Sequence, residues 1–135
     1  EFELMINEKA ENGESLTADV LCELYRQLNI LYYGEDIVID HELDMEWARI
    51  PHFYYNYYVY QYATGFSAAI ALSQRILKEG APAVKDYIGF LSGGCSKDPI
   101  SLLKGAGVDM TSTKPVTDAL KLFGELIDEM EELMK

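Results

Sequence analysis

The apolar positions along the chain recur three and four residues apart, which is the spacing of an amphipathic helix. In the first part of the chain this spacing predicts a helix over residues 2–10 with Gly13 as its stop. A second helix is expected to begin at Ser15 or Thr17, either of which can cap it, and to end at Gly34. Its single apolar stripe consists of Val20, Leu21, Leu24, Leu28 and Leu31.

Residues 35–50, EDIVIDHELDMEWARI, combine a short β-branched run with scattered acidic residues, so an irregular or extended connection is expected there. Pro51 then suits the first turn of a new helix, where its missing N–H is not needed. The alanine-rich stretch ATGFSAAIALSQRILKEG keeps helical period up to Lys78 and Gly80. One long helix from about Pro51 to Lys78 is therefore predicted, with Tyr57 and Tyr60 on one face.

Three further helices are expected near Pro82, after Asp98 and from Lys114. The last carries a predicted buried face made of Val116, Leu120, Phe123, Ile127, Met130 and Leu133. No repeat or linker interrupts the pattern. The chain is thus predicted to be all-α, with about six helices in a single unit over residues 1–135.

The net charge of the chain excludes some classes of binding partner. The 135 residues include 11 Lys and Arg against 23 Asp and Glu, a formal net charge of -12, so phosphate-rich nucleic acid and anionic membrane surfaces would be repelled. No apolar run reaches the roughly 18 residues of a membrane span. Cys22 and Cys95 lie in no CxxC or metal-ligand spacing. Free thiols in a reducing compartment, and hence a cytoplasmic location, are expected.

The chain contains no complete catalytic or metal-binding motif. It has two histidines, and four positions after His41 stands Met45, so DHELDMEW fails as the zinc-peptidase motif HExxH. His41 and Glu42 are interpreted as a surface pair. The loop SGGCSKDP lacks P-loop spacing and is typical of a plain interhelical turn, or of close backbone approach to a ligand. No metal-ligand set is predicted in these residues.

A dense aromatic row follows the second histidine. The ten positions after His52 contain six tyrosines and one phenylalanine. Buried phenol hydroxyls need hydrogen-bond partners, so the row indicates either a tyrosine-rich packing interface or a polar cleft. In a cleft, phenol and imidazole donors can stabilise an oxygen that gains negative charge during acyl transfer.

The stretch WARIPHFYYNYYVYQYATGFSAA resembles the tyrosine-rich helix of the oligoendopeptidase F family of zinc metallopeptidases, relatives of thimet oligopeptidase. GESLTADVLCELYRQLNILYYG, SGGCSKDPISLLKGAGVDM and KPVTDALKLFGELIDEMEELM resemble the same family's C-terminal part in the same order. The resemblance implies a C-terminal segment of the helical catalytic domain of a zincin-type oligopeptidase. Its Zn²⁺, held by HExxH and a further glutamate, would lie upstream of this chain, whose start looks cut.

The resemblance also implies roles for single residues. His52 and Tyr60 are expected to be catalytic, as hydrogen-bond donors to the oxyanion. Tyr57 is expected to bind substrate, and so is either Tyr54 or Tyr55, because the family's glycine-rich loop is shortened here to HFYYNYY and leaves that choice open.

Several functional hypotheses follow. The first is a metalloendopeptidase segment that acts on oligopeptides with the upstream part of its polypeptide and is inactive alone, where its first helix would expose an apolar face and favour self-association. The alternative is a stand-alone acidic helical module that binds a peptide or protein through an aromatic groove. A small-ligand pocket lined by tyrosines is a third.

Overall fold

The computed structural model describes residues 1–135 and consists of helices, with no β-strand. It contains six α-helices and two 3-10 segments, which confirms the all-α prediction. The chain divides into two compact units, Glu1–Val59 and Tyr60–Lys135. The expectation of a single helical unit over residues 1–135 stays a prediction. No helix combines the length and the apolar character needed to cross a membrane.

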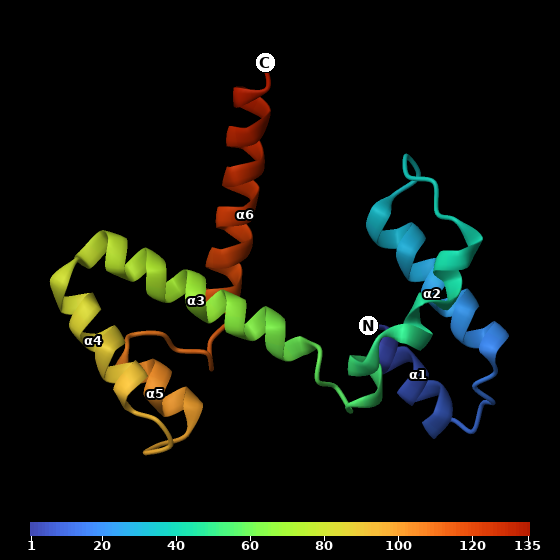
Figure 1. Cartoon of the computed structure of the whole chain (residues 1–135), viewed down its shortest axis with the longest axis horizontal. Helices are drawn as coiled ribbons and strands as arrows, with labels where there is room; N and C mark the ends of the chain where they lie inside the picture. The colour runs from blue at the N-terminus through green and yellow to red at the C-terminus, as the bar shows by residue number, and fades with distance from the viewer. The chain divides into compact units, whose positions relative to one another are not determined.

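The first unit contains two α-helices and two 3-10 helices (Figure 1). These are α1 (Phe2–Glu11), α2 (Ala18–Tyr33), η1 (His41–Arg49) and η2 (Pro51–Tyr54). Both predicted α-helices are thus confirmed within one or two residues at each end. The region expected to be irregular contains η1, which packs against α2.

Aromatic rings form the core of the first unit. Phe2 is 5% exposed, and its ring centroid lies 5.4 Å from that of Tyr25, 6.3 Å from Trp47 and 5.1 Å from Phe53. The four rings come from α1, α2, η1 and η2, so one cluster joins all four elements. Aromatic pairs at these distances add stabilisation beyond their buried area. The expectation that the first helix would expose its apolar face is therefore wrong, because Phe2 is central to this core.

A buried carboxylate joins α2 to η1 close to this core. Asp44, 5% exposed, accepts a hydrogen bond from Arg26 Nη1 at 2.9 Å, and its other oxygen lies 2.7 Å from His41 Nδ1. Burial would raise the pKa of the Asp44 carboxyl. The hydrogen bonds and charges of Arg26 and His41 outweigh that effect and hold the pKa below its usual range. The partner of His41 is thus Asp44, one helical turn on, instead of the Glu42 expected from the sequence.

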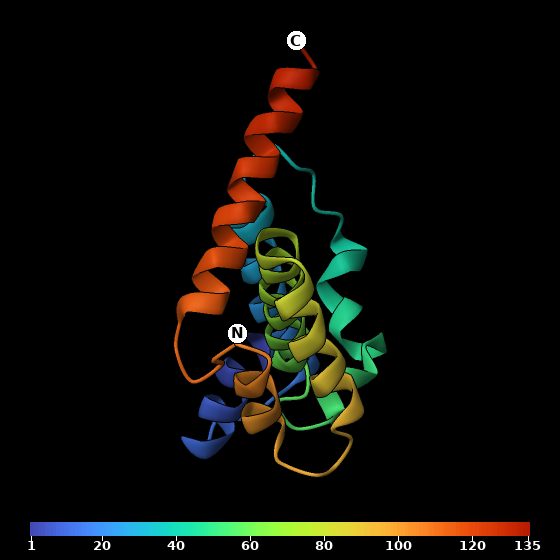
Figure 2. The ribbon, with the colours of Figure 1, turned by 90° about the vertical axis from the view of Figure 1, so that its left-hand side faces the viewer.

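The second unit contains the other four helices (Figure 2). These are α3 (Tyr60–Glu79), α4 (Ala81–Ser92), α5 (Pro99–Gly105) and α6 (Lys114–Leu133). Helix α3 packs against both α4 and α6, and α4 packs against α5. The small buried core of the second unit consists of Ala68, Leu72, Ala106 and Val108.

Helix starts follow the capping signals of the sequence. Thr17 Oγ1 accepts the N–H of Val20 at 3.3 Å, and Asp98 Oδ1 accepts the N–H of Ser101 at 2.9 Å. Each side chain satisfies an N–H that the first turn leaves without a backbone partner. The starts predicted near residues 17 and 98 are confirmed for this reason.

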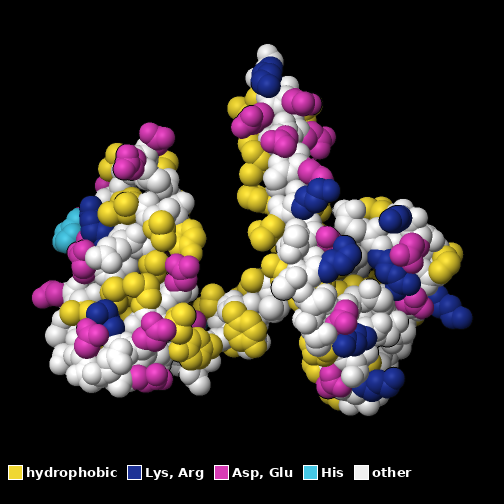
Figure 3. All heavy atoms as spheres, turned by 180° about the vertical axis from the view of Figure 1, so that it is seen from behind, with side chains coloured by type: hydrophobic (Ala, Val, Ile, Leu, Met, Phe, Trp, Pro, Cys, Tyr) yellow, Lys and Arg dark blue, Asp and Glu magenta, His cyan; other side chains and the backbone are white.

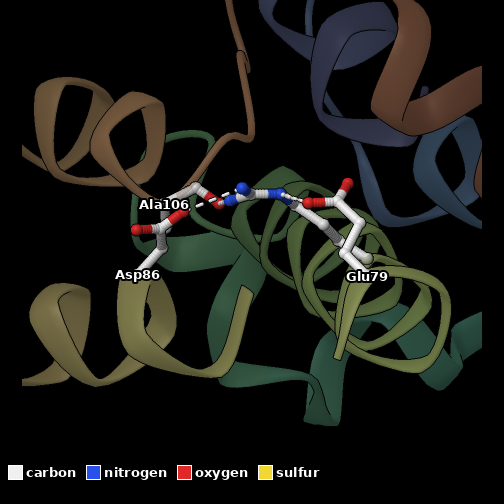
Figure 4. Close-up of polar contacts among 4 residues, drawn as sticks. Glu79, Asp86 and Ala106 are labelled. Carbon is white, nitrogen blue, oxygen red and sulfur yellow. Dashed lines mark hydrogen bonds and ion pairs between the residues drawn. The ribbon is translucent and has the colours of Figure 1, made fainter. Parts of the chain in front are cut away.

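Arg75 on α3 fastens three segments of the second unit (Figure 4). Its Nη2 donates to Asp86 on α4 at 2.8 Å, and its Nε donates to Glu79 at 3.0 Å. Its Nη1 donates to the carbonyl oxygen of Ala106, directly after α5. Gly107 follows with a φ of +81°, and a Cβ there would lie 2.6 Å from Arg75 Cζ. A side chain at position 107 would have to displace this guanidinium.

The last helix departs from its predicted packing. Among its residues only Pro115 and Ala119 are buried, while Phe123 is 64% exposed and Leu133 is 81% exposed. Hydrophobic side chains run along one side of α6 (Figure 3). The prediction of a buried face is therefore wrong for this structure: only the first turns of α6 pack on α3, and the amphipathic stripe beyond them lies at the surface.

Substitution Gly107→Ala should lower the thermal midpoint of the second unit more than Gly94→Ala does. Both glycines have a positive φ, +81° and +52°, so each alanine incurs a backbone cost of about 1–2 kcal/mol. Only at Gly107 must the new Cβ also displace Arg75, because Gly94 faces open space. Thermal unfolding followed by far-ultraviolet circular dichroism measures the difference. Equal midpoints for the two variants would contradict the role of Arg75.

The stability of the first unit should depend on the ionisation of Asp44. Because the folded-state pKa is lowered, the contribution is fully present above the ordinary aspartate pKa of about 3.9, and it is lost as the pH falls through the lower folded value. Wild type should thus lose more stability than Asp44→Asn between about pH 5 and about pH 2. Urea unfolding followed by fluorescence of Trp47, the single tryptophan, measures this. Asp36→Asn, at an exposed position, is the control, and parallel pH profiles for wild type and Asp44→Asn would refute the prediction.

The 135-residue chain should self-associate through the apolar side of α6. An exposed apolar stripe of this kind favours association because contact between two copies removes the stripe from water. The double variant Leu120→Glu, Phe123→Glu should shift the chain toward monomer in sedimentation velocity. Lys121→Glu makes the same two-unit change in net charge at an exposed position outside the apolar stripe of α6 and should leave association unchanged. A wild-type chain that stays monomeric at high concentration would disprove the prediction.

Candidate functional site

The aromatic row does not continue into the following helix. Residues 51–54 form the 3-10 helix η2, residues 55–59 are not helical, and α3 begins at Tyr60. Asn56 and Tyr57 have φ values of +47° and +59°, so their backbone is left-handed. A right-handed helix cannot pass through two such residues. The predicted long helix from Pro51 to Lys78 is therefore wrong in its first nine residues, and Tyr57 and Tyr60 do not share a helix face.

The predicted site residues belong to different elements. His52 and Tyr54 lie on η2, and Tyr55 and Tyr57 lie in the segment that follows it, all within the first unit. Tyr60 is the first residue of α3 and belongs to the second unit, with 63% of its surface exposed.

Three rings cluster in the first unit around the histidine. The His52 imidazole stacks on Tyr58 with a centroid distance of 5.6 Å and an interplanar angle of 23°. Tyr55 meets both rings edge to face, at 6.4 Å from His52 and 6.2 Å from Tyr58. The structure thus brings Tyr55 next to His52, and it adds Tyr58, which the sequence had not singled out. In the sequence, nothing distinguished Tyr58 from the other tyrosines of the row.

Tyr54 and Tyr55 differ in how their hydroxyl groups are used. Tyr54 donates to the carbonyl oxygen of Ala48 on η1 at 3.2 Å, so its phenol fastens η2 to η1. Tyr55 is 61% exposed, and its ring lies in the His52 cluster. Of the two, Tyr54 is the one whose hydroxyl joins two elements of the fold.

The left-handed turn is fixed by a carboxylate from α1. Glu3, 8% exposed, accepts the backbone N–H of Tyr57 through Oε1 at 2.9 Å. Hydrogen bonds to an ionised acceptor are stronger than neutral ones. Asn56 tolerates the left-handed region well, whereas a bulky residue such as Tyr57 adopts it only where its surroundings impose it. Sequence reasoning missed Glu3, because nothing in the chain links it to a residue 54 positions away.

The residues of the first unit do not form a zinc site. No group of three or more His, Cys, Asp or Glu side chains in the chain is arranged to hold a metal ion. His41 lies against Asp44 and is part of the link between η1 and α2. His52 packs against the rings of Tyr55 and Tyr58.

The glycine pair in SGGCSKDP serves a turn between α4 and α5. A Cβ at Gly93 would lie 2.6 Å from Leu102 Cδ2, so the backbone approaches α5 closely there. Gly94 has a φ of +52°, and Ser96 donates its N–H to the carbonyl of Gly93 at 3.0 Å. Of the two interpretations, the structure favours the interhelical turn, because the close approach is to Leu102.

These groups are suited to hydrogen-bond donation. Imidazole N–H and phenol O–H groups can donate to carbonyl oxygens and to an oxygen that becomes negatively charged. The cluster thus places one imidazole beside two phenols.

The chain is similar to known peptidases along its length. Residues 1–122 match the model of Peptidase family M3. Oligopeptidase PepF of Bacillus subtilis (strain 168) is 60% identical over 134 residues, which are 99% of this chain and 20% of that protein. Oligoendopeptidase F (chromosomal) of Lactococcus lactis subsp. cremoris is 42% identical over 135 residues, which are 100% of this chain and 22% of that protein.

A solved structure gives the same result. The crystal structure of oligoendopeptidase-F from Enterococcus faecium matches with a TM-score of 0.87 and 44% sequence identity, over 99% of this chain and 26% of that one. The chain thus spans about a fifth of the length of the curated relatives named above.

Proposed function

We propose that this chain, which belongs to Peptidase family M3, hydrolyses peptide bonds of oligopeptides as part of a longer polypeptide. The resemblance to oligoendopeptidase F that the sequence indicated is confirmed by the family match and by the related proteins. Oligopeptides are the substrate class that the names of these relatives point to, and the chain spans about a fifth of their length.

The cluster at His52 supports this proposal most directly. An imidazole stacked on Tyr58 and met by Tyr55 places hydrogen-bond donors together in a segment with left-handed backbone. Strained backbone of this kind often occurs at functional sites. A tyrosine-rich packing interface would not require a left-handed backbone.

His52 and Tyr60 are assigned as the donors to the reacting carbonyl oxygen. When water adds to the carbonyl carbon of the scissile bond, that oxygen becomes an oxyanion, and two N–H or O–H donors directed at it lower the barrier. The water gives up a proton as it adds, the C–N bond then breaks, and that proton passes to the leaving nitrogen. Tyr57 and Tyr55 are assigned to the substrate, whose backbone N–H and C=O groups offer the same hydrogen bonds in every sequence. Tyr54 is left out, because its hydroxyl already holds Ala48.

Zinc, which the family resemblance implies for the complete enzyme, does not fit the residues of this chain. His41 is held by Asp44, His52 lies among rings, and no third ligand accompanies either. When bound in such enzymes, zinc activates water and polarises the carbonyl. Its ligands are therefore assigned to the remainder of the longer polypeptide, and the 135-residue chain alone is expected to be inactive. A cytoplasmic location stays a prediction.

In the longer enzyme, Tyr60→Phe should lower kcat by roughly a hundredfold to a thousandfold, with little change in KM. The substitution removes one donor to the oxyanion and leaves the ring in place. Steady-state cleavage of an internally quenched fluorogenic oligopeptide measures both constants. Tyr33→Phe removes an exposed hydroxyl outside the row and is the matched control. An unchanged kcat for Tyr60→Phe would remove this residue from the reaction.

His52→Ala in the same assay tests the second donor. Its kcat should fall with an unchanged thermal midpoint, since His52 is only partly buried. A lower midpoint with normal turnover would make His52 a packing residue. Turnover by the 135-residue chain alone would contradict the need for residues outside it, and peptide binding without turnover in the longer polypeptide would favour the helical binding module.

A further inference from the structure

Glu3 is the one buried carboxylate whose side chain bonds to the segment that carries the aromatic cluster. It lies in the first turn of α1, and its Oε1 accepts the N–H of Tyr57 at 2.9 Å. A first-turn glutamate on an exposed helix usually faces solvent near its own helix end. Here the side chain is 8% exposed and reaches a residue 54 positions further along the chain. The Glu3 side chain is therefore directed at the Tyr57 turn.

The position of this carboxylate is itself rigid. The preceding residue, Phe2, is the centre of the aromatic core and contacts rings from three other elements. The carbonyl of Glu3 accepts a hydrogen bond from the Asn7 side chain at 2.7 Å. Core packing on one side and this hydrogen bond on the other hold the first turn of α1 in place. Glu3 thus presents a fixed acceptor to the turn.

The turn needs such an acceptor. Tyr57 lies outside any helix with a φ of +59°, and of the two left-handed residues it is the one with a bulky side chain. Strained residues persist where the surrounding structure determines their conformation. We infer that the hydrogen bond from the Tyr57 N–H to Glu3 holds Tyr57 in this conformation. Tyr58 follows immediately, and its ring stacks on His52. Relaxation of Tyr57 to a negative φ would thus redirect both tyrosines relative to His52.

We propose that Glu3 is a positioning residue of the peptidase site, which holds the Tyr57 turn so that Tyr57 and the His52–Tyr58 pair keep their reactive arrangement. This inference rests on the function proposed above. We assign Glu3 no contact with the substrate or with the reacting oxygen. It acts through the backbone of Tyr57, so its loss should affect the geometry of the site more than the fold of the unit.

The test compares Glu3→Ala and Glu3→Gln in the longer enzyme, with Glu8→Ala as the control on the exposed side of the same helix. Glu3→Ala removes the acceptor, whereas Glu3→Gln keeps an amide oxygen at the same reach. Glu3→Ala should lower kcat by up to about a hundredfold, as displaced catalytic groups do. Glu3→Gln should restore most of that loss, and Glu8→Ala should match wild type.

Hydrogen exchange read by mass spectrometry on peptides spanning residues 52–59 supplies a readout independent of activity. In Glu3→Ala the Tyr57 amide should exchange faster, and in Glu3→Gln it should stay protected. Unchanged exchange in Glu3→Ala would overturn the inference, whatever happens to kcat. If Glu3→Ala does not fold, Glu3→Asp takes its place, because the shorter side chain withdraws the acceptor and keeps the charge.

Tyr60→Phe, measured beside these variants, separates failure of this inference from failure of the proposed function. If exchange rises in Glu3→Ala and kcat holds, while Tyr60→Phe reduces kcat, Glu3 has no positioning role and the function stands. If neither Glu3→Ala nor Tyr60→Phe affects kcat, the assignment of the aromatic row to catalysis falls, and the role of Glu3 falls with it.

Discussion

Two consecutive residues with left-handed backbone, Asn56 and Tyr57, separate the aromatic row from the helix that follows it. Without them the row would continue into α3, and its phenols would be distributed around a helix surface at 100° intervals. The turn instead lets Tyr58 stack on His52 and lets Tyr55 meet both rings. The Tyr57 N–H in this turn donates to Glu3, and Glu3 follows Phe2, whose ring packs in the aromatic core. The arrangement of the candidate site thus depends on packing at the start of the chain.

The second unit has a different kind of constraint. Its buried core is small, and a polar group, the guanidinium of Arg75, joins α3 to α4 and to the carbonyl that follows α5. Gly107 is required there because its backbone comes against that group. Much apolar surface stays uncovered, above all along α6. A chain that spans about a fifth of its relatives' length would leave such surface if the remaining residues normally cover it.

The residue types in this chain decide which catalytic roles we assign to it and which we assign to residues outside it. Imidazole and phenol groups donate hydrogen bonds, and the chain holds no set of ligands for a metal. Donors alone cannot activate water, yet they can stabilise the charge that develops on a carbonyl oxygen. This is why we assign the chain to oxyanion stabilisation and substrate binding, and why the activation of water is left to residues outside it.

The sequence by itself determined the helices and most of their ends, because apolar spacing and capping residues such as Thr17 and Asp98 act within a few positions. It also identified the family, since the row around His52 is distinctive in its residue order. Asn56 was the only local sign of the turn. One asparagine was not enough evidence to end the helix that the surrounding residues predict. Tertiary structure decided the rest. The φ of Tyr57 depends on a carboxylate 54 residues away, and the partner of His41 proved to be Asp44 because Arg26 on α2 holds that side chain. Whether an apolar stripe is buried depends on which surfaces are available to cover it, and for α6 the chain's own helices cover only the first turns.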